Sequence, residues 1–72
     1  MVKTKDIYFV AWLEATKGLN FDKYEIIDSR HNIAEFTFEI DEEEFKKHKV
    51  EYLRSESVKT HYAFRRLKDI IQ

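Results

Sequence analysis

The chain has 72 residues without cysteine or proline, and its 13 basic and 14 acidic side chains leave a formal net charge of −1. This length suits one small domain, and the lack of cysteine excludes a disulfide-stapled scaffold and a cysteine-based zinc site. Hydrophobic residues make up 43% of the chain, which argues against intrinsic disorder, and no apolar run reaches the ~20 residues that a membrane-spanning helix needs.

The first segment of the chain predicts a helix over residues 5–17. Thr4 is a suitable N-cap, and Gly18 stands where a left-handed glycine commonly ends a helix. Residues 7–13 are apolar without a break and form two stripes on a helical wheel, whereas a helix in a thin two-layer domain needs only one. Two interpretations are open: the helix is sandwiched between the hairpin and the third helix, or one stripe is an exposed interface.

If a stripe of this helix is exposed, we expect it to be the narrower one, which contains Phe9. The wider stripe, with Tyr8 and Trp12, is better suited to cover a sheet. Aromatic side chains are frequent anchors of protein interfaces, so the partner would be another protein or a second copy of the chain. The candidate interface residues are Tyr8, Phe9, Val10, Trp12 and Leu13.

A β-hairpin is predicted next. Residues 23–28 form its first strand, and residues 29–32 form the connecting loop. From residue 34 to residue 40, apolar and polar side chains alternate with a period of two, which predicts a strand with one buried face and one solvated face. Phe36 and Phe38 are the candidate core residues on the buried face.

Asp41 begins a second predicted helix, which ends near residue 53. The acidic run over residues 41–44 has two interpretations, a metal site or a helix N-terminus. The helix interpretation is favoured, because carboxylates are stabilised at the positive end of a helix and Glu42 can pair with Lys46 one turn later. Adjacent carboxylates at a helix start also point in different directions. We therefore expect neither a metal ion nor another cofactor.

A short loop at residues 55–57 and a third helix from Thr60 to Ile71 complete the prediction. The element order is α-β-β-α-α, which defines an α+β fold: a small two-layer domain in which helices cover one face of an antiparallel hairpin. No Pro-, Ser- or Gly-rich stretch interrupts residues 1–72, so we expect a single domain without a linker. The third helix is expected to face the core with Ala63, Phe64, Leu67, Ile70 and Ile71.

Charge is divided unevenly along the chain. Residues 1–45 carry 5 basic and 11 acidic side chains, whereas residues 46–72 carry 8 basic and 3 acidic ones. The two parts either neutralise each other across the fold or form separate charged surfaces. A separate basic surface could bind the phosphates of a nucleic acid, with one aromatic ring for stacking. Its residues would be Lys46, Lys47, Lys49, Arg54, Lys59, Tyr62, Arg65, Arg66 and Lys68.

Motifs that carry catalysis are absent from the sequence. A single glycine cannot build a phosphate-binding loop, and His31, His48 and His61 fall on separate predicted elements. We therefore expect a non-enzymatic binding module that acts by protein–protein contact. The alternative is a nucleic-acid-binding module that uses the basic segment 46–68. The absence of cysteine and of an N-terminal signal peptide favours the cytoplasm.

The segment from Thr4 to Gly18 resembles the opening of a short bacterial and phage-borne family that is catalogued only as a domain of unknown function. The resemblance implies a compact stand-alone α+β domain, often encoded by mobile elements, and offers no catalytic residues to transfer. A phage or mobile-element accessory protein that binds or inhibits a host protein would fit it. Further along the chain, the similar residues are Phe36, Thr37, Phe38, Tyr52, Leu53, Val58, Phe64, Leu67 and Lys68.

Overall fold

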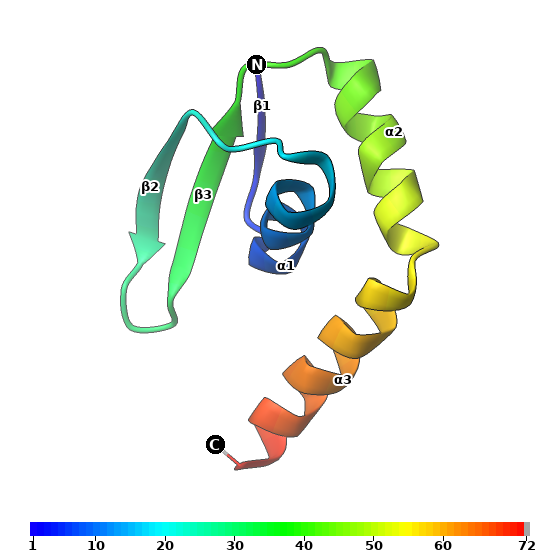
Figure 1. Ribbon diagram of the computed structural model, residues 1–72. Helices are drawn as coiled ribbons and strands as arrows, with labels where there is room; N and C mark the ends of the chain where they lie inside the picture. The colour runs from blue at the N-terminus through cyan, green and yellow to red at the C-terminus, as the bar shows by residue number, and fades with distance from the viewer. Residues whose placement is uncertain (72) are drawn as a thin grey trace.

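Residues 1–71 are described by the computed structural model, which has a three-stranded antiparallel sheet and three α-helices (Figure 1). The central strand is β3, and the order in the sheet is β1-β3-β2. The α+β class and the α-β-β-α-α order are confirmed, with one short strand added before the first helix. The elements are β1 (Val2–Thr4), α1 (Ile7–Trp12), its π-helical continuation η1 (Leu13–Lys17), β2 (Lys23–Asp28), β3 (Ile33–Phe38), α2 (Glu42–Leu53) and α3 (Glu56–Ile71).

The first helix begins later than predicted because Asp6, rather than Thr4, is its N-cap. The Asp6 carboxylate accepts hydrogen bonds from the N–H groups of Tyr8 at 3.1 Å and Phe9 at 3.2 Å. Thr4 is the last residue of β1, and its hydroxyl oxygen accepts the N–H of Asp6 at 3.2 Å. Gly18 ends the helical segment with φ of +66°, as predicted, because a glycine adopts this left-handed backbone without strain.

The narrower apolar stripe of the first helical segment is buried within one copy of the chain, and so is Trp12 of the wider stripe, whereas Ile7 and Ala11 of the wider stripe are exposed. Phe9 and Leu13 have no exposed surface, and Val10 and Trp12 are nearly as buried. The Phe9 ring packs 5.2 Å from the Tyr52 ring of α2, between centroids, and Figure 1 shows α1 between the sheet and α2. The prediction that the Phe9 stripe is exposed is therefore wrong. The first helix lies between two layers, but these are the sheet and α2 instead of the hairpin and the third helix, and its side with Ile7 and Ala11 is left uncovered.

The predicted buried face of the hairpin packs against this layer. Phe38 is fully buried and Phe36 is buried beside it, which confirms both as core residues. The Phe38 ring lies 5.4 Å from the Phe45 ring of α2, between centroids. The core is therefore shared by β3, the first helical segment and α2, with Val58 contributed by α3.

The last helix starts one turn earlier than predicted, at Glu56 instead of Thr60. Ser55 sets this start. Its hydroxyl donates to the carbonyl oxygen of Tyr52 at 2.6 Å and accepts the N–H of Val58 at 3.4 Å. A serine that caps orphan backbone groups at a helix junction removes the need for a longer loop.

The face of α3 that meets the rest of the fold is also different from the predicted one. Val58 is its buried residue, and His61 contacts α2 one turn later. At about 100° per residue, the predicted core residues lie on another side of the helix, and Phe64 and Leu67 are each 53% exposed. The prediction that they face the core is wrong. We call this largely exposed set the α3 stripe; it consists of Ala63, Phe64, Leu67, Ile70 and Ile71. Its one aromatic ring, Phe64, also meets the Tyr8 ring of α1 edge-on, with centroids 6.4 Å apart.

Candidate protein-binding surfaces

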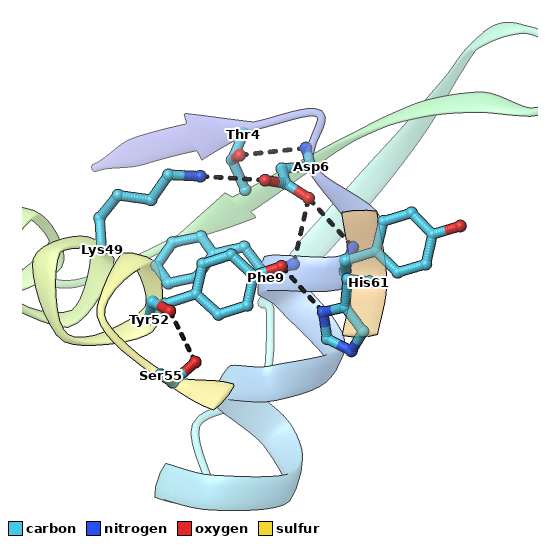
Figure 2. Close-up of polar contacts among 8 residues, drawn as sticks. Thr4, Asp6, Phe9, Lys49, Tyr52, Ser55 and His61 are labelled. Atoms are coloured by element: carbon cyan, nitrogen blue, oxygen red, sulfur yellow. Dashed lines mark hydrogen bonds and ion pairs between the residues drawn. The ribbon is translucent and has the colours of Figure 1, made fainter. Parts of the chain in front are cut away.

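A polar contact between α2 and α3 fixes the rotation of the last helix. The hydroxyl oxygen of Tyr52 lies 2.8 Å from Nδ1 of His61 (Figure 2). Burial, with a smaller contribution from the nearby Asp6 carboxylate, raises the pKa of Tyr52 to about 12, so the hydroxyl keeps its proton at neutral pH. The His61 ring also lies against Tyr8 of α1, with centroids 5.0 Å apart. These contacts determine which face of α3 is turned toward the rest of the fold.

Lys49 of α2 is tied to the start of α1. Its Nζ donates to Oδ2 of Asp6 at 3.0 Å and lies 4.5 Å from the centroid of the Phe9 ring (Figure 2). Partial burial by itself would raise the pKa of Asp6, but the hydrogen bonds from Lys49 and from the Phe9 N–H outweigh it and lower this pKa. Lys49 therefore has a structural role, because it links α2 to the N-terminus of α1.

An open groove lies between the C-terminal half of α3, the exposed side of α1 and the hairpin loop. In Figure 1, α3 runs from the end of α2 back beneath α1 toward this loop. The groove has a volume of about 870 Å³. Its apolar lining comes from both the first helix and the hairpin, namely Ile7, Tyr8, Ala11, Ile33, Ala34 and Phe36.

Positive charge surrounds this apolar lining. Four basic residues and one acidic residue line the groove, which gives a formal charge of +3 with His31 neutral. The guanidinium of Arg65 lies 5.1 Å from the centroid of the Tyr8 ring and makes a cation–π contact with it. The charged residues are Lys5, Arg30, Arg65, Lys68 and Asp69.

The hairpin loop places two of the groove residues through contacts of Asp28. Its carboxylate accepts the N–H of Arg30 at 3.0 Å and lies 2.7 Å from Nδ1 of His31. The His31 contact is the main reason why the pKa of Asp28 is lowered. Asn32 then adopts the left-handed conformation with φ of 55°, which asparagine tolerates better than most residues. The loop therefore has a defined shape, with Arg30 and His31 held at one end of the groove.

The interface predicted on the first helix is largely inaccessible. Tyr8 is the one member of that set that lines the groove. The others are part of the hydrophobic core and have at most 6% of their surface exposed: Phe9, Val10, Trp12 and Leu13.

The basic residues predicted to bind nucleic acid are spread over two helices, and three of them have acidic partners. Lys46 lies 3.8 Å from a carboxylate oxygen of Glu42 on the same helix. Lys59 lies 3.5 Å from a carboxylate oxygen of Glu56, which is also on the same helix. With Lys49 bound to α1, these three cations do not form one phosphate-binding track.

Four other members of the predicted basic set lie at two separate surface sites, and the last two lie at neither. Lys47 and Arg54 border a shallow depression beside Trp12. Arg65 and Lys68 belong to the groove on the other side of α1, whereas Tyr62 and Arg66 are exposed on α3 outside both sites. The groove residues that were not predicted as site residues are Lys5, Ile7, Ala11, Arg30, His31, Asn32, Ile33, Ala34, Phe36 and Asp69.

Within residues 1–71, no three His, Asp or Glu side chains gather closely enough to hold a metal ion. No helix in this part of the chain has both the length and the apolar character needed to cross a membrane. Comparisons with protein-family models, curated proteins and solved structures gave no significant match to the chain. The resemblance to a short bacterial and phage-borne family therefore stays a prediction.

Proposed function

We propose that the chain is a non-enzymatic binding module that acts by protein–protein contact. Its groove would receive an acidic segment of the partner that also carries apolar side chains. The observation that carries this proposal is the composition of the groove, in which four basic side chains surround an apolar lining. Charge complementarity would steer the partner to the site, and burial of apolar surface would stabilise the contact.

The apolar share of the groove favours a protein segment over a nucleic acid. Ile7 is 55% exposed and Ile33 is 38% exposed, so both have surface that a partner's apolar side chain can cover. Tyr8, the tyrosine of the groove, already contacts His61 and Arg65 with its ring. A ring with such neighbours is a poor stacking platform for a base, which needs a free face.

Nucleic-acid binding is the second candidate function. It is favoured by one observation, the gathering of Lys5, Arg30, Arg65 and Lys68 around a single groove, since phosphate contacts dominate affinity for nucleic acids. This site differs from the predicted basic segment, because two of its cations come from the first part of the chain.

A capture experiment with matched variants tests the proposal. The predicted relation to phage-borne proteins makes a bacterial host protein the first partner class to test. The immobilised chain is compared with R65E/K68E, which reverses two groove charges, and with R66E/K59E, which reverses two charges of α3 outside the groove. We expect a bacterial protein to be retained by the wild type and by R66E/K59E but lost with R65E/K68E.

The same capture is repeated after nuclease treatment of the lysate. Retention that does not change with nuclease supports direct protein contact. Loss of the captured protein after nuclease, or direct binding of single- or double-stranded DNA or RNA to the pure chain, supports the second candidate. Equal loss with both variants would contradict a role of the groove. Circular dichroism of each variant shows whether α3 is still helical.

A further inference from the structure

Two largely exposed apolar surfaces of the described residues lie outside the groove proposed above. One is the α3 stripe, in which Ile70 is 68% exposed and Ile71 is 83% exposed. The other is the uncovered side of the sheet at β2. We propose that two copies of the chain pair by reciprocal contact, with the α3 stripe of each copy seated on this side of the other copy's sheet. The proposal goes beyond the proposed function and does not depend on the groove.

The uncovered part of the sheet belongs to the same face as the core. Tyr24 and Ile26 stand directly opposite Phe36 and Ala34 in the antiparallel register, and directly opposed side chains point to the same face. Nevertheless, Tyr24 is 60% exposed and Ile26 is 57% exposed. Figure 1 shows the reason, since β2 is the strand farthest from α1.

Phe21 extends this surface beyond the end of β2. Its ring lies 5.9 Å from the Tyr24 ring and 5.0 Å from the Phe36 ring, measured between centroids. We call Phe21, Tyr24 and Ile26 the sheet margin. A sheet face of this kind is normally covered by a helix in an α+β fold, and none of the helices within residues 1–71 covers it (Figure 1).

The α3 stripe of the same copy is held away from the sheet margin. Tyr52 and His61 are joined at 2.8 Å, and Ser55 bonds to both helix ends at the turn between α2 and α3. These contacts turn the side of α3 that carries Arg65 and His61 toward α1. Turning the stripe to its own sheet would break them, whereas a second copy can approach without such a change.

Charge favours the helix-on-sheet arrangement over direct pairing of two α3 helices. Asp22 and Asp28 stand at the two ends of β2 beside the sheet margin, whereas Glu25 and Glu35 are paired on the opposite face of the sheet. Residues 56–71 carry two acidic and four basic side chains, net +2, with Arg65 and Lys68 in the groove and Arg66 next to Leu67 of the stripe. Two α3 helices side by side would bring like charges together. An α3 helix on the sheet of a second copy brings opposite charges together, which lowers the free energy of the contact and selects this partner.

The dimensions of the two surfaces also agree. At 1.5 Å per residue, the stripe from Ala63 to Ile71 is about 12 Å long. At ~3.4 Å per residue, β2 extends over about 17–20 Å, so the sheet margin can accommodate the stripe. Reciprocal contact about a two-fold axis makes each copy contribute both surfaces. A standard interface buries ~800 Å² per partner, about one-seventh of the 5614 Å² that this chain exposes.

Solution mass with matched variants is the first test. F64E places a carboxylate in the stripe, and Y62E places one at an equally exposed position outside it, since Phe64 is 53% and Tyr62 is 55% exposed. Light scattering coupled to size exclusion should show a concentration-dependent dimer of the 8.8 kDa chain. We expect F64E to weaken the dimer by at least about 30-fold, as expected for a central interface residue, and Y62E to leave it unchanged.

Disulfide cross-linking between two different chains tests the arrangement itself. The chain has no cysteine, so L67C and isotope-labelled I26C can be mixed and oxidised, and any mixed disulfide must join two copies. We expect the L67C–I26C species to dominate over the L67C–L67C species, and a mixture of L67C with K47C on α2 to give little product.

Two results would overturn the proposal. One is a wild-type chain that stays monomeric at about 1 mM, a concentration at which even a weak dimer with Kd in that range is visible. The other is a dominant L67C–L67C disulfide, which would mean that the α3 helices pair directly. Either result leaves the groove function standing, because that function is tested through Arg65 and Lys68 with a different partner.

Discussion

The first and the last helix of this chain differ in how much of their apolar surface the fold covers. The first helical segment is apolar without a break from residue 7 to residue 13 and supplies the centre of the core, with Phe9 and Leu13 fully buried, although Ile7 is 55% exposed. The last helix is amphipathic over 16 residues, and Val58 is its buried residue. The sheet and α2 cover the side of the first segment that carries Phe9 and Leu13. The α3 stripe stays largely exposed, apart from the contact of the Phe64 ring with the Tyr8 ring at 6.4 Å between centroids.

The largest expected effect on stability comes from replacing phenylalanine by lysine in the first helix, and the same replacement in the last helix serves as the comparison. F9K places a charge in the centre of the core, where an unpaired ammonium group is strongly unfavourable, and F64K places it on an exposed stripe. Removing a buried Phe side chain alone costs about 3–5 kcal/mol, which is comparable with the total stability of a small domain. We expect F9K to be unfolded by circular dichroism at 25 °C.

F64K is the control for that experiment, and it should remain folded with a melting curve close to that of the wild-type monomer. If F9K retained a cooperative transition, Phe9 would not be a core residue. The substitution at Phe64 should instead act on self-association, in the same direction as F64E.

The hairpin and the element order could be predicted from the sequence because their signals are local. The alternation through Phe36 and Phe38 fixes which face of β3 is buried, and Gly18 marks a helix end by its backbone freedom alone. β1 was not predicted, because the alternation of apolar and polar side chains cannot be recognised over only three residues. It exists because β3 pairs Val2 with Phe38 and Thr4 with Phe36, which are contacts distant in sequence.

The candidate site was beyond prediction for a related reason. The helical pattern of α3 indicates that Phe64 and Leu67 share a face, but not which way that face points. The direction is set by the Tyr52–His61 contact and by the Ser55 turn. Once α3 is rotated in this way, Arg65 comes to lie beside residues of the first helix and the hairpin loop, and no local pattern connects these segments.

An intermediate effect on stability is expected at Asp6, the N-cap of α1. D6A removes the N-cap of α1 and the partner of Lys49, and we expect a loss of about 1–2 kcal/mol of unfolding free energy in urea at pH 7. D6N is the control, because its side-chain oxygen can still cap the helix while the charge is lost. We expect D6N to cost less than D6A.

The pH dependence of stability separates the charge of Asp6 from its capping role. The folded pKa of Asp6 lies below its ordinary value of 3.8, so the unfolded chain binds more protons at acid pH and stability rises with pH. The ionised carboxylate therefore gives its full contribution above pH 3.8, and this is lost as the pH falls through the folded pKa. D6N should lose less stability than the wild type between pH 5 and pH 2. An identical pH slope in the two proteins would contradict the role of the Lys49–Asp6 pair.

The smallest expected effect on stability comes from an ion pair within α3, which like the Lys49–Asp6 pair joins a lysine to a carboxylate. Lys59 and Glu56 are 3.5 Å apart, with side chains 75% and 91% exposed, whereas Lys49 and Asp6 are 3.0 Å apart and much less exposed. Water and salt screen an exposed pair, so K59Q should change the unfolding free energy by only about 0–0.5 kcal/mol. K49Q should cost more, because it removes a partly buried hydrogen bond and a cation over the Phe9 ring. Urea titrations at low and at 1 M salt measure both, and the K59Q difference should vanish at high salt while most of the K49Q difference stays. A larger loss of unfolding free energy for K59Q than for K49Q would contradict the greater contribution of the less exposed Lys49–Asp6 pair.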